Sequence, residues 1–361
     1  MNKRRYLILC IAVLSLVLLA GCGKKSKKEE HKTEHKTEDV QELIEQKESY
    51  IFGLSGMNMS DPYFDILKQA MEIELSDYEI TLEVKDALMD QELQNQQINE
   101  FIEEGVDLVF LSPVDKTGIN PGIEALNKAS IPVINIDTQV DDMSNVKAFV
   151  GSDNKDIGLM CGEHLIEKMP EGGNIVIIEN PSSHAVNDRI NGFEYALSKE
   201  NFQVVSRKEA TYDVDGAYEA MKLAIEECNA KNVDIDAVMC GNDNMALGVE
   251  KALEEAYGKI RVHGESEEGY SDSSEKTFYN EDGKRILVYG VNGSPDVKDA
   301  LSSRGSYIVA TVAQSPINMG TKAVEIAIDI IKNRDYEKEV ITPSYLINNG
   351  NIVLYGTNGW Q

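Results

Sequence analysis

The feature that most constrains the fold is a regular alternation of short apolar runs and helical segments from Tyr50 onward. The runs are rich in Ile and Val, as expected for strands buried on both faces. They predict two series of strands, the first at 50–55, 80–86, 107–112, 132–137 and 147–151, and the second at 174–180, 202–207, 235–240, 286–292 and 307–314.

Helical spacing connects these strands. In 214–231 one stripe carries Ala217, Met221, Ala224, Ile225 and Cys228. The two series also resemble each other, because 105–126 aligns with 232–253 through a Val-Asp pair, an apolar strand, a polar turn and a helix ending in Ala-Leu. The sequence therefore predicts an α/β fold with two similar doubly wound lobes, each built on its own parallel sheet.

The first residues are predicted to lie outside this fold. Residues 1–21 combine a basic head, an apolar stretch and small residues, which is typical of an export signal and too short for a convincing membrane-spanning helix. The stretch 19–22, "LAGC", resembles the lipobox of bacterial lipoproteins, which implies cleavage before Cys22 and lipid on its sulfur. A plain signal peptide with an incidental cysteine is the alternative.

Residues 22–47 are almost wholly charged, with "HKTE" repeated, and they predict a solvated tether. His31 and His35 lie four residues apart on this tether, a spacing that a metal could use, but tether composition is the favoured explanation. The chain has 361 residues and a net charge of −27, which makes binding to nucleic acid or anionic lipid a poor hypothesis.

The cysteines of the exported part give no metal signature. Cys161, Cys228 and Cys240 show no CxxC or Cys/His zinc spacing. Cys161 and Cys228 lie on apolar faces of helical patterns, which predicts buried thiols, and a Cys228–Cys240 disulfide remains open. Residues 257–285 are polar, acidic and rich in Gly and Ser, and they predict a surface loop.

Polar and aromatic side chains follow many of the predicted strands directly. In open parallel sheets, ligands bind beyond the carboxyl ends of the strands, so these side chains predict the site. Its members are Asp61, Tyr63, Phe64, Asp137, Arg189, Tyr212, Asn242, Asn292 and Gln314.

The chemistry of this set favours a neutral polyol. Asp, Asn, Gln and Arg offer planar forks that can pair with two adjacent hydroxyls, and aromatic rings offer flat apolar faces for a sugar ring. An anion would need several cations, and Arg189 is the one cation among these positions.

Several of these positions also have a structural interpretation. Asp61 before Pro62 suits a helix N-cap. Asp243 is predicted as the N-cap of the helix that follows, with Asn242 pointing into the cleft. His184 is an isolated loop histidine, more often structural than catalytic, and Asn292 suits a turn.

These residues lie in stretches that resemble the type I periplasmic sugar-binding proteins of ABC transporters, the ribose and galactose/glucose group. The resemblance covers the chain from about residue 48 apart from 257–285, and it rests on "SDPYFDILKQAM", "IPVINIDTQ", "VGSDNKDIG", "NDRINGFEYAL", "GNDNMALG", "VYGVNGSPD" and "TVAQSPINMG".

The resemblance implies a role for each position. Tyr63 and Phe64 stack on the sugar with Asp61 beside them, Asp137 and Arg189 contact ring hydroxyls, and Tyr212 forms the second aromatic wall. Asn242, Asn292 and Gln314 hold the remaining hydroxyls. This chain departs from ribose binders at Asn292, where they commonly have Asp, and at Thr138, where they have Arg, which puts ribose itself in doubt.

The resemblance also implies the domain organisation and partners. The N-terminal lobe would comprise 48–152 and 315–343, and the C-terminal lobe 153–314 and 344–361, with a three-segment hinge that lets the lobes close on a sugar. The calcium loop of galactose/glucose binders is absent from "EKMPEGGNIV", so we expect no metal and no cofactor. The expected protein is a monomeric lipoprotein on the outer face of the cytoplasmic membrane that delivers a monosaccharide to an ABC permease.

Other classes are weaker on the sequence. A sensory subunit with the same fold and ligand, docking on a chemoreceptor or histidine kinase, is the main alternative. An enzyme is disfavoured because the chain has no GxSxG, Walker or HExxH motif. A transcription regulator of the lac repressor type needs a DNA-reading helix pair where this chain has an export signal.

Overall fold

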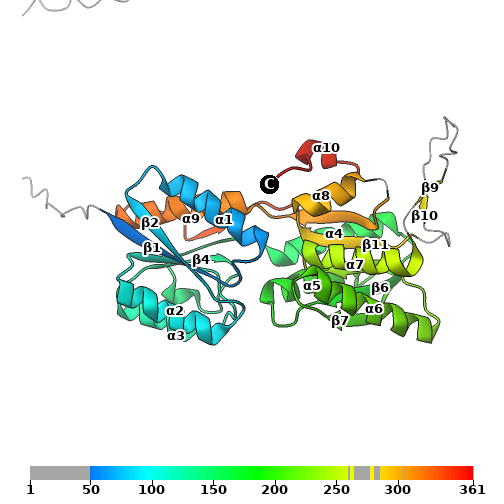
Figure 1. Cartoon of the computed structure of the whole chain (residues 1–361), viewed down its shortest axis with the longest axis horizontal. Helices are drawn as coiled ribbons and strands as arrows, with labels where there is room; N and C mark the ends of the chain where they lie inside the picture. Colours follow the sequence, from blue (N-terminus) through cyan, green and yellow to red (C-terminus); the bar gives the residue numbers. More distant parts are fainter. Residues whose placement is uncertain (1–48, 259–260, 264–276, 280–284, 304, 361) are drawn as a thin grey trace, which may run out of the picture. The chain divides into compact units, whose positions relative to one another are not determined.

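Two six-stranded sheets organise the chain in the computed structural model, which describes residues 49–258, 261–263, 277–279, 285–303 and 305–360 (Figure 1). The signal segment 1–21, the proposed lipidation site Cys22 and the tether 22–47 lie outside these residues, as does most of the predicted 257–285 loop. Within the described part of the chain, no helix has the length and apolar character needed to cross a membrane.

Sheet 1 has the strand order β13-β5-β4-β3-β1-β2, with every neighbouring pair parallel. Its strands are β1 (Tyr50–Gly56), β2 (Ile80–Asp86), β3 (Leu108–Leu111), β4 (Val133–Asp137), β5 (Ala148–Gly151) and β13 (Glu339–Ile341). Helices α1 (Pro62–Leu75) and α9 (Pro316–Ile331) pack together on one side, and α2 (Gln91–Glu104) and α3 (Asn120–Lys128) pack together on the other. We call this assembly lobe 1.

Sheet 2 repeats the arrangement with the order β14-β12-β11-β8-β6-β7. Its strands are β6 (Gly173–Glu179), β7 (Phe202–Glu209), β8 (Ala237–Cys240), β11 (Leu287–Asn292), β12 (Ile308–Ala313) and β14 (Tyr345–Asn348). All pairs are parallel except β12 with β14, which is antiparallel. The two matching strand orders confirm the predicted α/β fold with two doubly wound lobes.

Lobe 2 comprises sheet 2 and the helices packed on it. One face carries α4 (Asn154–Lys168) and α5 (His184–Leu197), and the other carries α6 (Val214–Lys231), α7 (Asp243–Tyr257) and α8 (Pro295–Ser302). The short α10 (Ile352–Tyr355) contacts α8 and β14. A one-turn 3-10 helix, Met143–Asn145, lies between β4 and β5 in lobe 1.

The burial of the central strands explains their sequence. Every residue of β3, β4 and β12 is buried, because helices cover both faces of each sheet.

The starts of several helices are set by local residues. The side chains of four N-cap residues accept a hydrogen bond from the first turn that follows: Asp61, Asp153, Ser183 and Ser315. Proline occupies the first turn of α1, α8 and α9.

The described chain passes between the two sheets at 152–153, 314–315 and 342–344. These crossings make both lobes from discontinuous segments, and the described residues form one compact unit. Gln314, at one of the crossings, is also among the predicted site residues.

Some features differ from the sequence prediction. The short edge strands β13 and β14 were not predicted, and the described parts of the 257–285 loop include an antiparallel pair, β9 (Arg261–His263) and β10 (Thr277–Tyr279). Cys161, Cys228 and Cys240 are free and buried, so the Cys228–Cys240 disulfide is not formed. Burial raises the pKa of the Cys161 thiol to about 12.

Candidate functional site

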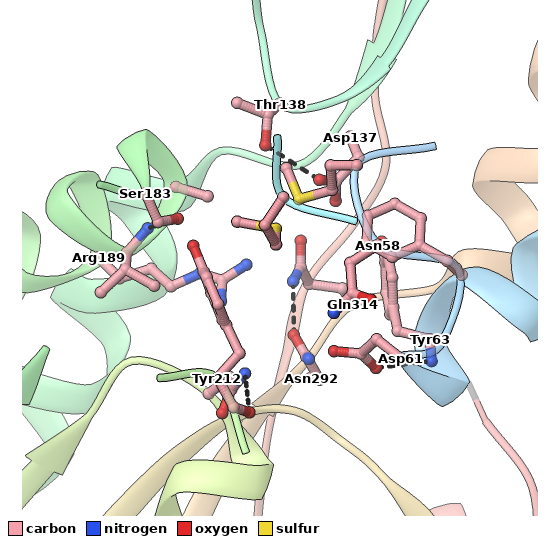
Figure 2. Close-up of a pocket in the computed structure, with 16 residues that line it drawn as sticks. Asn58, Asp61, Tyr63, Asp137, Thr138, Ser183, Arg189, Tyr212, Asn292 and Gln314 are labelled. Carbon is pink, nitrogen blue, oxygen red and sulfur yellow. Dashed lines mark hydrogen bonds between the residues drawn. The ribbon is translucent and has the colours of Figure 1, made fainter. Parts of the chain in front are cut away.

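A pocket lies between the carboxyl ends of the two sheets, and both lobes line it (Figure 2). The space that no protein atom fills, including the part open to solvent, is about 480 Å³. All nine residues predicted from the sequence line it: Asp61, Tyr63, Phe64, Asp137, Arg189, Tyr212, Asn242, Asn292 and Gln314.

Two strand ends place a polar residue in the pocket through an unusual backbone conformation. Asp137, the last residue of β4, has a φ of 63°, and Asn292, the last residue of β11, has a φ of 130°. Positive φ is rare for residues other than glycine, and such strain is retained mainly at functional positions. The conformation turns each side chain out of its strand at the edge where the ligand site is expected.

Arg189 enters the pocket from α5 and is held by lobe 2. Its side chain is 5% exposed. Nε donates to Asn154 Oδ1 at 2.8 Å, and Nη1 donates to the carbonyl oxygen of Gly241 at 2.9 Å. These two bonds leave part of the guanidinium fork for a ligand while preventing the long side chain from swinging away.

The glycines of the α4–α5 crossing set the position of Arg189. A Cβ on Gly158 would lie 1.8 Å from the Arg189 carbonyl oxygen, and one on Gly192 would lie 2.0 Å from the Lys155 carbonyl oxygen. Only glycine permits this approach of the two helix backbones. The crossing therefore brings the start of α5, with Arg189, close to Asn154 at the start of α4.

Two carboxyl groups face this guanidinium from lobe 1. Asp61 caps α1 by accepting from the Tyr63 N–H at 3.0 Å, and Asp137 accepts from Thr138 Oγ1 at 3.0 Å. Burial raises the pKa of both carboxyl groups above their ordinary range, and the charge of Arg189 opposes that rise. With two carboxylates and one guanidinium, the pocket disfavours an anion and suits hydroxyl donors.

The side-chain amides of Asn292 and Gln314 form a hydrogen-bonded pair in the pocket. Gln314 Nε2 donates to Asn292 Oδ1 at 2.9 Å (Figure 2). This bond assigns the two amide orientations. The opposite ends, Asn292 Nδ2 and Gln314 Oε1, are a donor and an acceptor, which matches the two capacities of a hydroxyl group.

Aromatic rings come from both lobes. Tyr63 and Phe64 are in edge contact at 5.4 Å between ring centroids, and Tyr212 comes from the β7–α6 loop of lobe 2. The Tyr212 hydroxyl is buried without a hydrogen-bond partner among the described residues. A buried hydroxyl without a partner carries a desolvation cost that a ligand hydroxyl in the pocket would offset.

The cap assignment at the start of α7 is wrong. Asn242, not Asp243, is the N-cap: its Oδ1 accepts from Met245 N at 2.8 Å, and its Nδ2 donates to the Tyr212 carbonyl oxygen at 3.3 Å. Asp243 neither caps the helix nor lines the pocket. It is buried and accepts from Thr311 Oγ1 at 2.7 Å and from Ser294 N at 2.6 Å, which ties α7 to β12 and to the start of α8.

The pocket also has lining residues that were not predicted as contacts. They are Met57, Asn58, Met89, Ser183, Ala185 and Val186. Thr138, which follows β4 and stands where ribose binders have Arg, also lines the pocket. Asn58 lies two residues after the end of β1 and could have been found by the strand-end rule. Met57 and Met89 are apolar, and the prediction selected polar and aromatic positions. His184, by contrast, is absent from this lining and lies with its Nε2 at 3.5 Å from Asp115 Oδ2 of lobe 1.

Among the described residues, no three His, Cys, Asp or Glu side chains lie close enough together to hold a metal ion. The donors of the pocket are amides, hydroxyls and one guanidinium, and its two carboxyl groups come from different elements of lobe 1.

Comparison with known proteins agrees with the fold. The family described as "Periplasmic binding protein domain" matches residues 52–335. The ribose import binding protein RbsB of Bacillus subtilis (strain 168) is 29% identical over 299 residues, covering 82% of this chain and 87% of that protein. The D-allose-binding periplasmic protein of Escherichia coli (strain K12) is 23% identical over 286 residues, covering 76% and 82%.

Among solved structures, an ABC transporter solute binding protein from Bacillus halodurans C-125 with bound myo-inositol has a TM-score of 0.73 and 25% identity. The match covers 86% of this chain and 98% of that one. Because the family match spans most of the folded residues, the chain belongs to the periplasmic binding protein family, whose members bind solutes and are not enzymes.

Proposed function

We propose that this protein is an exported solute-binding lipoprotein that captures a neutral monosaccharide or cyclic polyol between its two lobes. The observation that carries the proposal is the convergence of nine predicted side chains from both lobes on one pocket. Three relatives or neighbours named above bind ribose, D-allose or myo-inositol according to their names, and all three ligands are neutral polyols.

The pocket chemistry supports a neutral ligand. Asp61 and Asp137 offer acceptors for hydroxyl protons, Arg189 offers donors, and the Asn292–Gln314 pair offers one of each. Sugar acids and phosphates are disfavoured because their charge would add to that of the two carboxylates. Tyr63, Phe64 and Tyr212 would cover the apolar faces of the ring, and Asn242 would contact a further hydroxyl.

The proposal extends to delivery. Lipid on Cys22 would hold the protein at the outer face of the cytoplasmic membrane, with 22–47 as a tether. Closure of the lobes about the crossings at 152–153, 314–315 and 342–344 would bury the sugar, and the closed form would deliver it to an ABC permease.

The ligand class is tested by thermal-shift screening of the mature chain against pentoses, hexoses, inositols, sugar acids and amino acids. A ligand at a hundredfold excess over its Kd stabilises the folded state by about 2.7 kcal/mol, which raises Tm. Neutral polyols should give the largest shifts. Shifts from amino acids or sugar acids alone would contradict the proposal.

The site is tested in the same assay with Arg189→Ala. We expect binding to weaken by about 2 kcal/mol, because the variant removes a charged donor from a buried site. Arg207→Ala is the matched control, since Arg207 lies on lobe 2 outside the pocket and pairs with Glu179 and Glu194. Equal affinities for the two variants would refute the proposed role of Arg189.

A further inference from the structure

The C-terminal tail, Gly356–Trp360, connects lobe 2 with a pocket residue of lobe 1. It leaves α10, which packs on lobe 2, and ends between α8 and α1 (Figure 1). The ring of Trp360 packs edge-on against Tyr63 at 5.8 Å between centroids and an interplanar angle of 71°. Trp360 also contacts the apolar cluster of lobe 1 that contains α1 and α9 residues.

The residue before Trp360 is anchored to lobe 2. Lys298, on α8, exposes none of its surface, and its Nζ donates to the Gly359 carbonyl oxygen at 2.7 Å. Burial lowers the pKa of this ammonium group. A buried ammonium group is costly unless it is well bonded, so this bond marks a defined attachment point for the tail.

Tyr63 is the point where tail and pocket meet. Its ring lines the pocket, and it is only 3% exposed. Phe64 contacts one edge of the ring, and the hydroxyl lies 3.7 Å from Met319 Sδ of α9. Trp360 supplies a further ring contact, and it comes from a segment that is attached to the opposite lobe.

We propose that the tail is a strap between the lobes and that Trp360 is a positioning residue, which orients the Tyr63 ring for ligand binding. The inference rests on the proposed sugar-binding function of the pocket. Trp360 is not itself among the residues that line the pocket, so it acts through Tyr63. Losing the indole should therefore change affinity through the orientation of another ring.

The test compares Trp360→Leu with Trp360→Phe in the mature chain by calorimetric titration with D-ribose, D-allose and myo-inositol. Because leucine removes the aromatic edge contact with Tyr63, the leucine variant should bind the polyol roughly three- to tenfold more weakly than the wild type. Phenylalanine keeps an aromatic ring and should restore most of the affinity. Val353→Ser is the control, because Val353 is 89% exposed on the nearby α10. Equal affinity of the wild type and Trp360→Leu would overturn the proposal.

A second readout does not depend on ligand. Trp360 is the single tryptophan of the chain, so its fluorescence reports the tail alone. Lys298→Met should make the indole more accessible to acrylamide, with emission shifted to longer wavelength. A fully quenchable wild-type indole would refute the strap. If no polyol binds while the indole is protected, the proposed function fails and the strap stands.

Discussion

Asp137 and Asn292 occupy equivalent positions in the two lobes, and both have positive φ. Each is the last residue of the strand third from one edge, β4 in sheet 1 and β11 in sheet 2. Their φ values are 63° and 130°. Both line the pocket. The internal repeat therefore supplies one polar side chain from each lobe, in each case from a strand-end residue with positive φ.

Replacing Asn292 by glycine and by alanine separates the backbone cost from the side-chain role. Glycine adopts positive φ without a Cβ penalty, so Asn292→Gly should be more stable than Asn292→Ala by about 1 kcal/mol. Both variants lose the amide and should bind sugar more weakly. Urea unfolding and titration check the two effects. Equal stability would mean that the backbone conformation at 292 carries no penalty.

Asn242 has two roles that different substitutions should separate. Serine caps helices about as well as asparagine, whereas alanine at an N-cap costs about 1 kcal/mol. Asn242→Ser should therefore keep its Tm while Asn242→Ala loses stability, and both should weaken ligand binding because neither carries an amide. Wild-type affinity in the serine variant would reduce Asn242 to a structural cap.

Asp243 should make stability fall with rising pH. Burial raises its pKa from 3.8 to about 6. Between these values the folded state retains a proton that the unfolded chain has released. Its contribution to the free energy of unfolding is therefore largest below about pH 4 and decreases up to about pH 6, by up to about 3 kcal/mol.

Urea unfolding of Asp243→Asn across this range checks the effect. The variant should lack this decrease relative to wild type. Asp213 is a control of opposite sign, because hydrogen bonding by the Gly216 N–H lowers its pKa. The contribution of Asp213 to the free energy of unfolding should disappear as pH falls. A wild-type slope in Asp243→Asn would contradict the assignment.

The His184–Asp115 pair should couple the lobes weakly. The atoms are 3.5 Å apart across the lobes, and both side chains are partly exposed. Such pairs contribute about 0–1 kcal/mol, so His184→Ala should weaken ligand binding no more than about fivefold.

A control pair lies within lobe 2. Lys251 and Asp215 are 3.6 Å apart and do not span the lobes. Lys251→Ala should leave ligand affinity unchanged. An effect of His184→Ala well above about fivefold would indicate a role other than the ion pair.

The fold was predictable because its signals are local. β8 is an apolar run whose residues are all buried, as expected for a strand covered by helices on both faces, and β2 is an alternating run at the edge of sheet 1. The short edge strand β13 was missed, since Glu339 and Ile341 are exposed and carry little hydrophobic pattern.

Nine of the residues that line the pocket were predictable for a related reason. The carboxyl ends of parallel strands meet at one edge, so strand-end side chains gather there whatever their identity. The roles of single atoms were not predictable. Asn242 and Asp243 are adjacent and equally good caps, and contacts of Asp243 with Ser294 and Thr311, more than fifty residues away in sequence, decide between them.

The sequence by itself therefore determined the two α/β lobes and nine of the side chains that line the pocket, because periodicity and strand ends are short-range properties. Only the tertiary structure decided which groups pair within that set: Gln314 with Asn292, Arg189 with Gly241, and Trp360 with Tyr63. Those contacts depend on how distant segments pack, and no local pattern encodes them.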